Sequence, residues 1–290
     1  MLVLRNFRRL GLFQFFLMMT WPVYTTNNTQ VPFQTYTYKE IGSVKLDLDV
    51  FTPSKEVSGD VLSPVIILFH GGGWTSGKRE SLHRQCKYFA EHGIVAVTAD
   101  YRFRNRESQG IYSTKEICIR DAKSAIRWVK SHAGKLHVDT LKIILGGGSA
   151  GGHLATMAAL DSTINDPTDN TRISTRADLL VLFNPAYTLS DDSSLQPFNL
   201  ISTSSPSTIM FFGSNDHWKL ASDTLCTKLK QKGVRTEMWI ANGQTHTFFN
   251  KEPWAQSTCD KAYDFLVKCN LIKGGIPQQN SSLGTLIEEF

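Results

Sequence analysis

Short, almost wholly apolar runs recur along this chain and leave few folds open to it. They span residues 64–69, 94–98, 141–145, 179–183 and 208–212, and the last strand candidate is 234–240. A strand that is apolar throughout is covered on both faces, as in parallel sheets. Helical periodicity fills the intervals at 81–92, 114–133, 149–160, 219–232 and 254–269. This alternation predicts an α/β fold with a mostly parallel, twisted sheet and helices on both faces.

The 290 residues are expected to form one α/β domain. Alternating polar and apolar side chains at 33–38 and 44–51 are typical of half-exposed strands ahead of the central runs. No internal repeat is present, so a single domain over residues 31–272 accounts for the pattern. Residues 273–290 are polar and rich in Gly and Ser, which predicts a loose C-terminal tail.

The first 26 residues have a composition of their own. Arg5, Arg8 and Arg9 precede an apolar run over residues 10–21, which is typical of a secretory signal peptide. The run is too short for a stable membrane span. Residues 1–26 are therefore expected to be a signal peptide or an N-terminal apolar segment that packs on the domain. The first case predicts a secreted or periplasmic protein, and the second a cytoplasmic one.

The bulk composition excludes several classes of protein. With 41% hydrophobic and 20% charged residues the chain is that of an ordinary folded domain. Three of the five excess positive charges lie in the N-terminal arginines and no other Lys/Arg block occurs, so no nucleic-acid partner is expected. The five cysteines form no CxxC and no zinc-binding spacing. We expect buried thiols, although export would allow one or two disulfides.

Residues 147–151 read Gly-Gly-Ser-Ala-Gly and match the pattern G-x-S-x-G. They follow the apolar run 141–145 and precede a helical stretch, which is the strand–turn–helix context of a nucleophile elbow. Small flanking residues are required because the turn is tight and exposes the hydroxyl of Ser149. A glycine-rich turn entering an ordinary helix, including a phosphate-binding one, is the alternative reading of this motif alone.

A second glycine motif supports the elbow. His70 is followed by Gly71, Gly72, Gly73 and Trp74, directly after the apolar run 64–69. Glycines let a loop turn its backbone N–H groups toward a carbonyl oxygen that becomes negatively charged. This HGGG-type loop accompanies the elbow in lipases and esterases. The two motifs together favour a serine nucleophile over a flexible loop.

The acid and the base are expected later in the chain, in the order Ser, acid, His. Asp216 follows the apolar run 208–212 by four residues and His246 follows the last strand, so both lie at carboxyl ends of strands, where α/β sheets build their sites. His217 adjoins the acid too closely to be oriented by it, and His153 lies on the elbow helix. Asp223, the competing acid, falls inside a predicted helix.

With these segments the chain resembles the α/β-hydrolase esterases related to hormone-sensitive lipase, nearest the small bacterial feruloyl-esterase-like and acetyl-esterase-like branch. The resemblance covers residues 38–269. It implies a Ser149, Asp216 and His246 triad with an oxyanion hole from the N–H groups of Gly72, Gly73 and Ala150. It also implies that residues 100–102 and Asp121 are structural and form an internal ion pair.

Two departures from the family pattern bear on the substrate. Many relatives have an acidic residue just before the nucleophile, where this chain has Gly148. The same relatives carry a helical cap, whereas residues 187–207 are too short and too polar for a large one. Little or no cap is therefore expected. The site should then be shallow, with Trp74 as a substrate-binding wall beside the oxyanion loop.

These features predict a serine carboxylesterase that acts on short-chain carboxylic esters, including acyl groups on carbohydrates, without a metal or cofactor. Its partner would be a small-molecule or carbohydrate ester, and the oligomeric state is left open. A kynurenine-formamidase-like amidase is the first alternative, since such enzymes share an HGG loop and a GxSAG elbow. A non-catalytic binding protein on the same fold is the second, although such proteins usually lose a triad residue and here all three are present.

Overall fold

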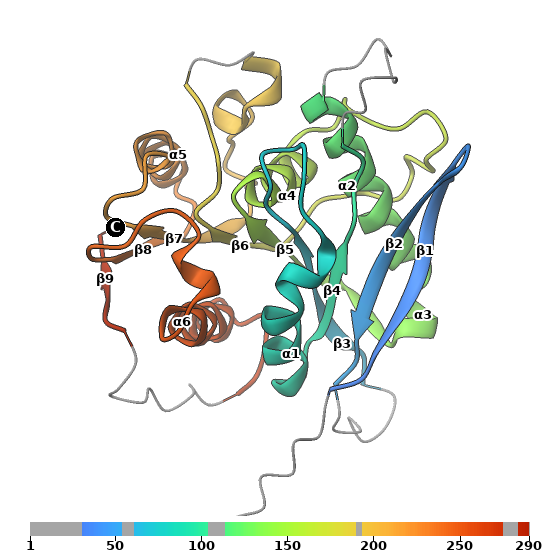
Figure 1. Cartoon of the computed structure of the whole chain (residues 1–290), viewed down its shortest axis with the longest axis horizontal. Helices are drawn as coiled ribbons and strands as arrows, with labels where there is room; N and C mark the ends of the chain where they lie inside the picture. Colours follow the sequence, from blue (N-terminus) through green and yellow to red (C-terminus); the bar gives the residue numbers. More distant parts are fainter. Residues whose placement is uncertain (1–30, 54–60, 104–113, 190–192, 275–283, 290) are drawn as a thin grey trace, which may run out of the picture. The chain divides into compact units, whose positions relative to one another are not determined.

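The apolar runs of the sequence form strands that lie side by side in one sheet (Figure 1). The computed structural model describes residues 31–53, 61–103, 114–189, 193–274 and 284–289. The strands of this part are β1 (Phe33–Ile41), β2 (Val44–Phe51), β3 (Ser63–Phe69), β4 (Val95–Ala99), β5 (Val138–Gly148), β6 (Leu179–Phe183), β7 (Ser207–Gly213), β8 (Thr236–Ala241) and β9 (Leu286–Glu288). Their order across the sheet is β1-β2-β4-β3-β5-β6-β7-β8-β9.

The parallel strands form the buried centre of the sheet, and the antiparallel strands form its edges. From β4 through β3, β5, β6 and β7 to β8 the strands run parallel. At the edges β1, β2 and β9 pair antiparallel. Side chains of β3 alternate between two apolar cores, with Val65 and Ile67 in one and Ile66 and Leu68 in the other. A strand between two cores has no face for polar side chains, and the predicted mostly parallel sheet is confirmed.

Helices cover both faces of the sheet (Figure 1). They are α1 (His83–Glu91), α2 (Thr114–Ser131), α3 (Ala133–Leu136), α4 (Ala150–Leu160), α5 (Lys219–Gln231) and α6 (Trp254–Lys268). Helices α1 and α6 pack in one core, whereas α2, α4 and α5 contribute to the other. Short 3₁₀ turns are η1 (Arg79–Leu82), η2 (Ser193–Leu195), η3 (Pro197–Asn199) and η4 (Phe248–Asn250). The predicted helical stretches are confirmed, and the architecture is that of an α/β-hydrolase.

The predicted C-terminal tail is wrong for its last residues. Within the described residues 284–289, Leu286–Glu288 form β9 and pair with β8, where Leu286 lies opposite Ala241. Leu286 is buried, but Ile287 and Glu288 are exposed. A three-residue strand with one buried side chain leaves too short a pattern to be seen in sequence. Residues 275–283 of the predicted tail lie outside the described residues.

The predicted absence of a large cap holds where the structure describes the chain. Within the described residues 187–189 and 193–206 the only regular elements are the short η2 and η3 turns, and β7 begins at Ser207. No helix among the described residues is both long and apolar enough to cross a membrane. The predicted signal or apolar segment over residues 1–26 lies outside the described residues.

An ion-pair cluster ties the antiparallel edge of the sheet to α2. Nε and Nη2 of Arg102 donate to the buried carboxylate of Asp121 at 2.7 and 2.8 Å. Lys39 of β1 donates to Asp121 at 3.1 Å and to Asp166 at 2.6 Å. The pairing of Arg102 with Asp121 is the internal ion pair that the family resemblance implies. Asp100 instead pairs with Arg79.

Asp121→Asn should lower the free energy of unfolding by about 3 kcal/mol, because it removes the fully buried carboxylate that Arg102 and Lys39 share and leaves them with Asp166. The exposed pair of Glu40 and Lys45 is the matched control, since pairs in water contribute little. Glu40→Gln should change the free energy by less than about 0.5 kcal/mol. Urea unfolding followed by circular dichroism measures both. Equal effects from the two variants would contradict the importance of the buried cluster.

Candidate active site

Ser149 lies at the tight turn between β5 and α4. Its backbone φ is +53°, a conformation that residues other than glycine rarely adopt. The N–H of Ser149 donates to the carbonyl of Phe183 at 3.0 Å, and its own carbonyl accepts from the N–H of Ala186 at 3.0 Å. These bonds hold the turn against the end of β6. The predicted nucleophile elbow is thus present as a strained strand–turn–helix junction.

Two glycines of the elbow are required by close contacts. A Cβ on Gly151 would collide with the backbone carbonyl of Phe69, because α4 starts directly against the end of β3. A Cβ on Gly148 would lie 2.5 Å from Cζ of Phe249, whose buried ring fills that space. This contact explains why the chain lacks the acidic residue that many relatives have before the nucleophile.

The three predicted triad residues meet at the carboxyl ends of the strands. Nε2 of His246 lies 2.8 Å from Oγ of Ser149, and Nδ1 lies 2.8 Å from Oδ2 of Asp216. The Asp216 side chain is fully buried, and its Oδ1 accepts the N–H of Trp218 at 3.0 Å. The His246 side chain is 23% exposed, so substrate and water can reach the hydroxyl beside it. The arrangement is that of a nucleophile, a base and an orienting acid.

The competing residues lie elsewhere or have other partners. Asp223 sits in α5 and accepts from Nζ of Lys219 at 2.9 Å. His217 is exposed, with its ring centre 5.8 Å from that of His246. His153 is buried, where Nε2 donates to the carbonyl of Leu195 at 2.7 Å. Its role is therefore in packing.

The HGGG loop lies against the elbow. A Cβ on Gly71 would lie 3.2 Å from Cβ of Ser149. The carbonyl of Gly72 accepts the N–H groups of Thr75 and Ser76, which folds the loop back on itself. Within the described residues, no carbonyl accepts a backbone hydrogen bond from the N–H groups of Gly72 and Gly73. Such donors, beside the first N–H of α4, could receive a developing oxyanion.

Trp74 is largely a core residue. It is 9% exposed, and its Nε1–H donates to Nδ1 of His153 at 3.3 Å. The ammonium of Lys115 lies 4.1 Å from the indole ring centre. Through His153 and the carbonyl of Leu195, the oxyanion loop is thus tied to the segment that carries η2 and η3. A role for Trp74 as a substrate wall stays a prediction, with little of its surface free for it.

Sequence reasoning missed one residue that the structure brings into the site. Asn184, fully buried directly after β6, has its Nδ2 3.1 Å from Nδ1 of His246. A polar residue at the carboxyl end of a strand was the available signal, by the same rule that identified Asp216.

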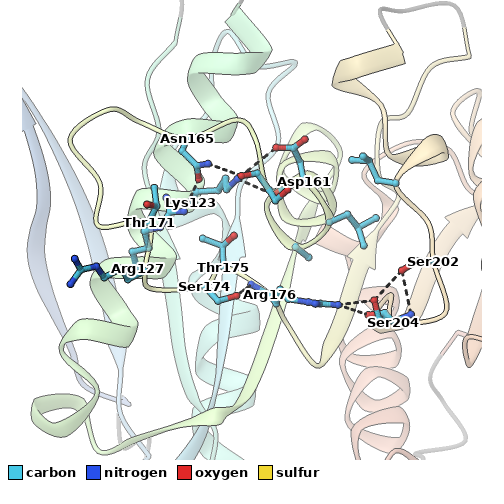
Figure 2. Close-up of a pocket in the computed structure, with 15 residues that line it drawn as sticks. Lys123, Arg127, Asp161, Asn165, Thr171, Ser174, Thr175, Arg176, Ser202 and Ser204 are labelled. Carbon is cyan, nitrogen blue, oxygen red and sulfur yellow. Dashed lines mark hydrogen bonds and ion pairs between the residues drawn. The ribbon is translucent and has the colours of Figure 1, made fainter.

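A cavity of about 430 Å³ (Figure 2) lies at the C-terminal end of α4, the end opposite Ser149. Nζ of Lys123 donates there to the backbone carbonyl of Asp161 at 2.8 Å, and Arg127 pairs with Asp169. Burial lowers the pKa of Lys123 to about 8, although the nearby Asp161 opposes the shift. The residues that line this cavity hydrogen-bond to one another, as Arg176 does to Ser204. The polar groups there thus serve to hold the surrounding loops in place.

All five cysteines are in the described part and are free thiols. Cys86, Cys118, Cys226 and Cys259 are buried, and burial raises the pKa of Cys226 to about 12. The expectation of buried thiols is confirmed for these four cysteines. A thiol with a raised pKa forms little thiolate at neutral pH and is therefore unreactive.

Comparison with known proteins identifies the class. The BD-FAE family matches residues 48–181. The carboxylic ester hydrolase LipM of Mycobacterium tuberculosis is 37% identical over 132 residues, which are 45% of this chain and 28% of LipM. Esterase LipQ of the same organism is 37% identical over 106 residues, 36% of this chain and 23% of LipQ. The chain thus spans about a quarter of the length of these curated relatives.

A solved structure matches over nearly its whole length. Thermogutta terrifontis esterase 2, phosphoramylated by tabun, has a TM-score of 0.77 and 32% identity, covering 85% of this chain and 98% of the esterase. Together with the elbow, the HGGG loop and the Ser-His-Asp geometry, these matches show that the chain belongs to the α/β-hydrolase esterases related to hormone-sensitive lipase.

Ser149→Ala should reduce ester turnover by roughly 10⁴-fold or more, because it removes the attacking oxygen. The hydroxyl contributes little to packing, so the circular dichroism spectrum and Tm should stay close to wild type. A fluorophosphonate probe followed by mass spectrometry should label Ser149 in the wild type and give no label in the variant. Retained turnover, or a label on another serine, would contradict the assignment.

Asp216→Asn should lower kcat by orders of magnitude, because an amide presents an N–H to His246 and favours the wrong tautomer. Asp223→Asn is the matched control, since that carboxylate pairs with Lys219 on α5 and not with His246. Its kcat should remain within about twofold of wild type, as for a substitution away from the site. Steady-state kinetics on p-nitrophenyl acetate compares the two, and an exchange of the two results would show that the acid was misassigned.

Proposed function

We propose that the protein hydrolyses short-chain carboxylic esters, with Ser149 as nucleophile, His246 as base and Asp216 as the acid that orients the base. The observation that carries this proposal is the pair of 2.8 Å contacts that join His246 to Ser149 on one side and to Asp216 on the other. These distances lie within the range in which a proton can pass between nucleophile and base.

The reaction proceeds in two acyl transfers. Nε2 of His246 accepts the Ser149 proton while Oγ bonds to the ester carbon, and the carbonyl electrons form an oxyanion. The N–H groups of Gly72, Gly73 and Ala150 receive that oxyanion. When the tetrahedral intermediate collapses, the C–O bond to the alcohol breaks and His246 protonates the departing oxygen. Water then attacks the acyl-enzyme with His246 as base, and the carboxylic acid is released.

Asp216 supports both steps from a buried position. Its carboxylate accepts the Nδ1–H of His246, which fixes the tautomer with a free lone pair on Nε2. Because Asp216 also accepts the backbone N–H of Trp218, the carboxylate keeps its direction while the ring becomes an imidazolium. The charge of Asp216 then stabilises that cation.

The short η2 and η3 turns favour small acyl groups, because they supply little apolar surface over the site. For comparison, Thermogutta terrifontis esterase 2 has been solved with propionate and with butyrate bound. The proposed substrate range includes acyl groups on carbohydrates. We also propose that the protein is secreted or periplasmic if residues 1–26 are a signal peptide. N-terminal sequencing of the protein from the outside of the expressing cell tests that location.

An ester panel separates this function from its rivals. A kynurenine-formamidase-like amidase would turn over N-formylkynurenine better than p-nitrophenyl acetate, and a binding protein would turn over neither. Acetylated and feruloylated sugars in the same panel identify the acyl group. We expect p-nitrophenyl acetate to be the better substrate of this chain, because its relatives are named as ester hydrolases.

Acetyl to butyryl p-nitrophenyl esters should give a higher kcat/KM than decanoyl and longer ones. Each methylene contributes about 0.8 kcal/mol only where it can be buried, and an uncapped site buries few of them. The measurement is kcat/KM for acyl chains from two to sixteen carbons. It is made with the full-length protein and with a truncated protein that starts at Thr26, so that any effect of the N-terminal segment on the acyl-length preference is measured. An optimum at twelve carbons or more in the truncated protein would show a deep acyl tunnel.

A further inference from the structure

Asn184 is fixed beside the nucleophile by its neighbours in the chain. It is fully buried after β6, its φ is +41°, and its N–H donates to the carbonyl of Phe211 at 2.8 Å. The residue before it, Phe183, accepts the N–H of Ser149, and Ala186 donates to the carbonyl of Ser149. The backbone of Asn184 is therefore held beside the elbow by bonds of the same segment that holds the elbow.

The carboxamide of Asn184 stands over the ring face of His246. Its Nδ2 lies 3.1 Å from Nδ1 and 3.3 Å from Nε2 of the ring. An atom nearly equidistant from both nitrogens at this range cannot lie in the ring plane, because it would collide with Cε1 between them. The contact is thus with the π face and leaves the in-plane bonds to Asp216 and Ser149 intact.

The face of the ring offers no lone pair that could accept a hydrogen bond from an N–H group above it. Nδ1 uses its proton for Asp216, and Nε2 uses its in-plane lone pair for the Ser149 hydroxyl. Within the described residues, the Oδ1 of Asn184 is buried without a hydrogen-bond partner, an unfavourable state for a strong acceptor. The oxygen and nitrogen of a carboxamide are nearly indistinguishable in shape, so a half-turn of the group exchanges them without moving other atoms.

We propose that Asn184 is a positioning residue that turns its carboxamide oxygen toward the face of His246 and stabilises the imidazolium formed during acyl transfer. The proposal rests on the esterase function and specifies how its base is assisted. During each acyl transfer the ring gains a full positive charge, and the fully buried carboxamide of Asn184 can act on that charge as an oriented dipole. A neutral carbonyl favours that cation, yet it does not compete with Asp216 for the Nδ1 proton as a second carboxylate would.

The ionisable groups that face His246 come from three places. Asp216 faces Nδ1 from the loop after β7, and Ser149 faces Nε2 from the elbow. The exposed His217 is the third, with its ring centre 5.8 Å from that of His246 and the two ring planes tilted by 43°. Asp216 supplies the in-plane negative charge, and Asn184 adds a partial one on the ring face.

The test is the acid limb of the pH profile of kcat/KM for p-nitrophenyl acetate, which reports the loss of the neutral base. Asn184→Leu keeps the size and removes the dipole, so kcat should fall about 10- to 100-fold. Its acidic midpoint should move to lower pH by roughly half a unit or more, because the cation loses a favourable partner. Asn184→Asp should move the midpoint in the opposite direction, since it puts a full charge over the ring.

Ser222→Ala is the matched control, because it removes a fully buried hydroxyl that has no partner among the described residues, on α5. It should leave kcat and the midpoint unchanged. Asn184→Ala, which fits any space that Asn occupies, replaces the Leu variant if that variant does not fold. A midpoint that stays fixed in the Leu or Ala variant indicates a purely structural Asn184, and one that rises indicates an inward amino group. Either result overturns the proposal.

The esterase function is tested separately by turnover of the wild type and its loss in Ser149→Ala. Wild-type turnover that depends on Ser149, combined with an unmoved midpoint, rejects the Asn184 proposal alone. Absence of wild-type turnover rejects the function itself.

Discussion

Two backbone hydrogen bonds hold Ser149 in a conformation that an unconstrained serine avoids. The N–H of Ser149 is bound by Phe183 and its carbonyl by Ala186, so the elbow is attached to the end of β6 on both sides of the strained residue. Because the turn cannot relax, the hydroxyl projects from the sheet and α4 starts at once. The first N–H group of that helix is then free beside the hydroxyl. The rest of the site is arranged around this fixed point.

The parallel sheet explains how distant segments reach that point. The ends of β3, β5, β6, β7 and β8 lie at one edge, and each is followed by a residue or loop of the site: the HGGG loop, Ser149, Asn184, Asp216 and His246. Parallel strands place all their carboxyl ends together, so no long loop is required to assemble the group. The central strands are buried on both faces, which makes this edge rigid.

The same physics decides how much of the molecule could be predicted from its sequence. Burial on both faces leaves a run of apolar residues, so the central strands and the residues at their ends, including Asp216, are visible in sequence. Edge strand β9 is not, because Leu286 is its one buried residue. The role of Asn184 cannot be recognised in sequence, because Asn before Pro is also an ordinary turn signal. The inward packing of Trp74 depends on His153, a partner 79 residues away that local pattern cannot supply.

Gly148 and Phe249 show that the site is also shaped by a contact the family pattern does not describe. The ring of Phe249 lies where a side chain at position 148 would project, and it stacks on Phe183 with ring centres 4.9 Å apart. Phe249 follows His246 by three residues, so its packing anchors the loop that carries the base. An acidic residue at position 148 would displace this ring. The chain therefore fixes the His246 loop by an aromatic contact at the place where many relatives have a carboxylate.

Backbone strain in the described part of the chain is concentrated at this edge. Of its six non-glycine residues with positive φ, four belong to the site: Trp74, Ser149, Asn184 and Thr247. Each such conformation is unfavourable by about 1–3 kcal/mol and persists only where the surroundings dictate it. The two apolar cores supply that constraint, since strands packed on both faces cannot shift to relieve a strained end. The stability of the sheet is thus used to hold the HGGG loop, Ser149, Asn184 and the loop of His246 in conformations that none of them would keep alone.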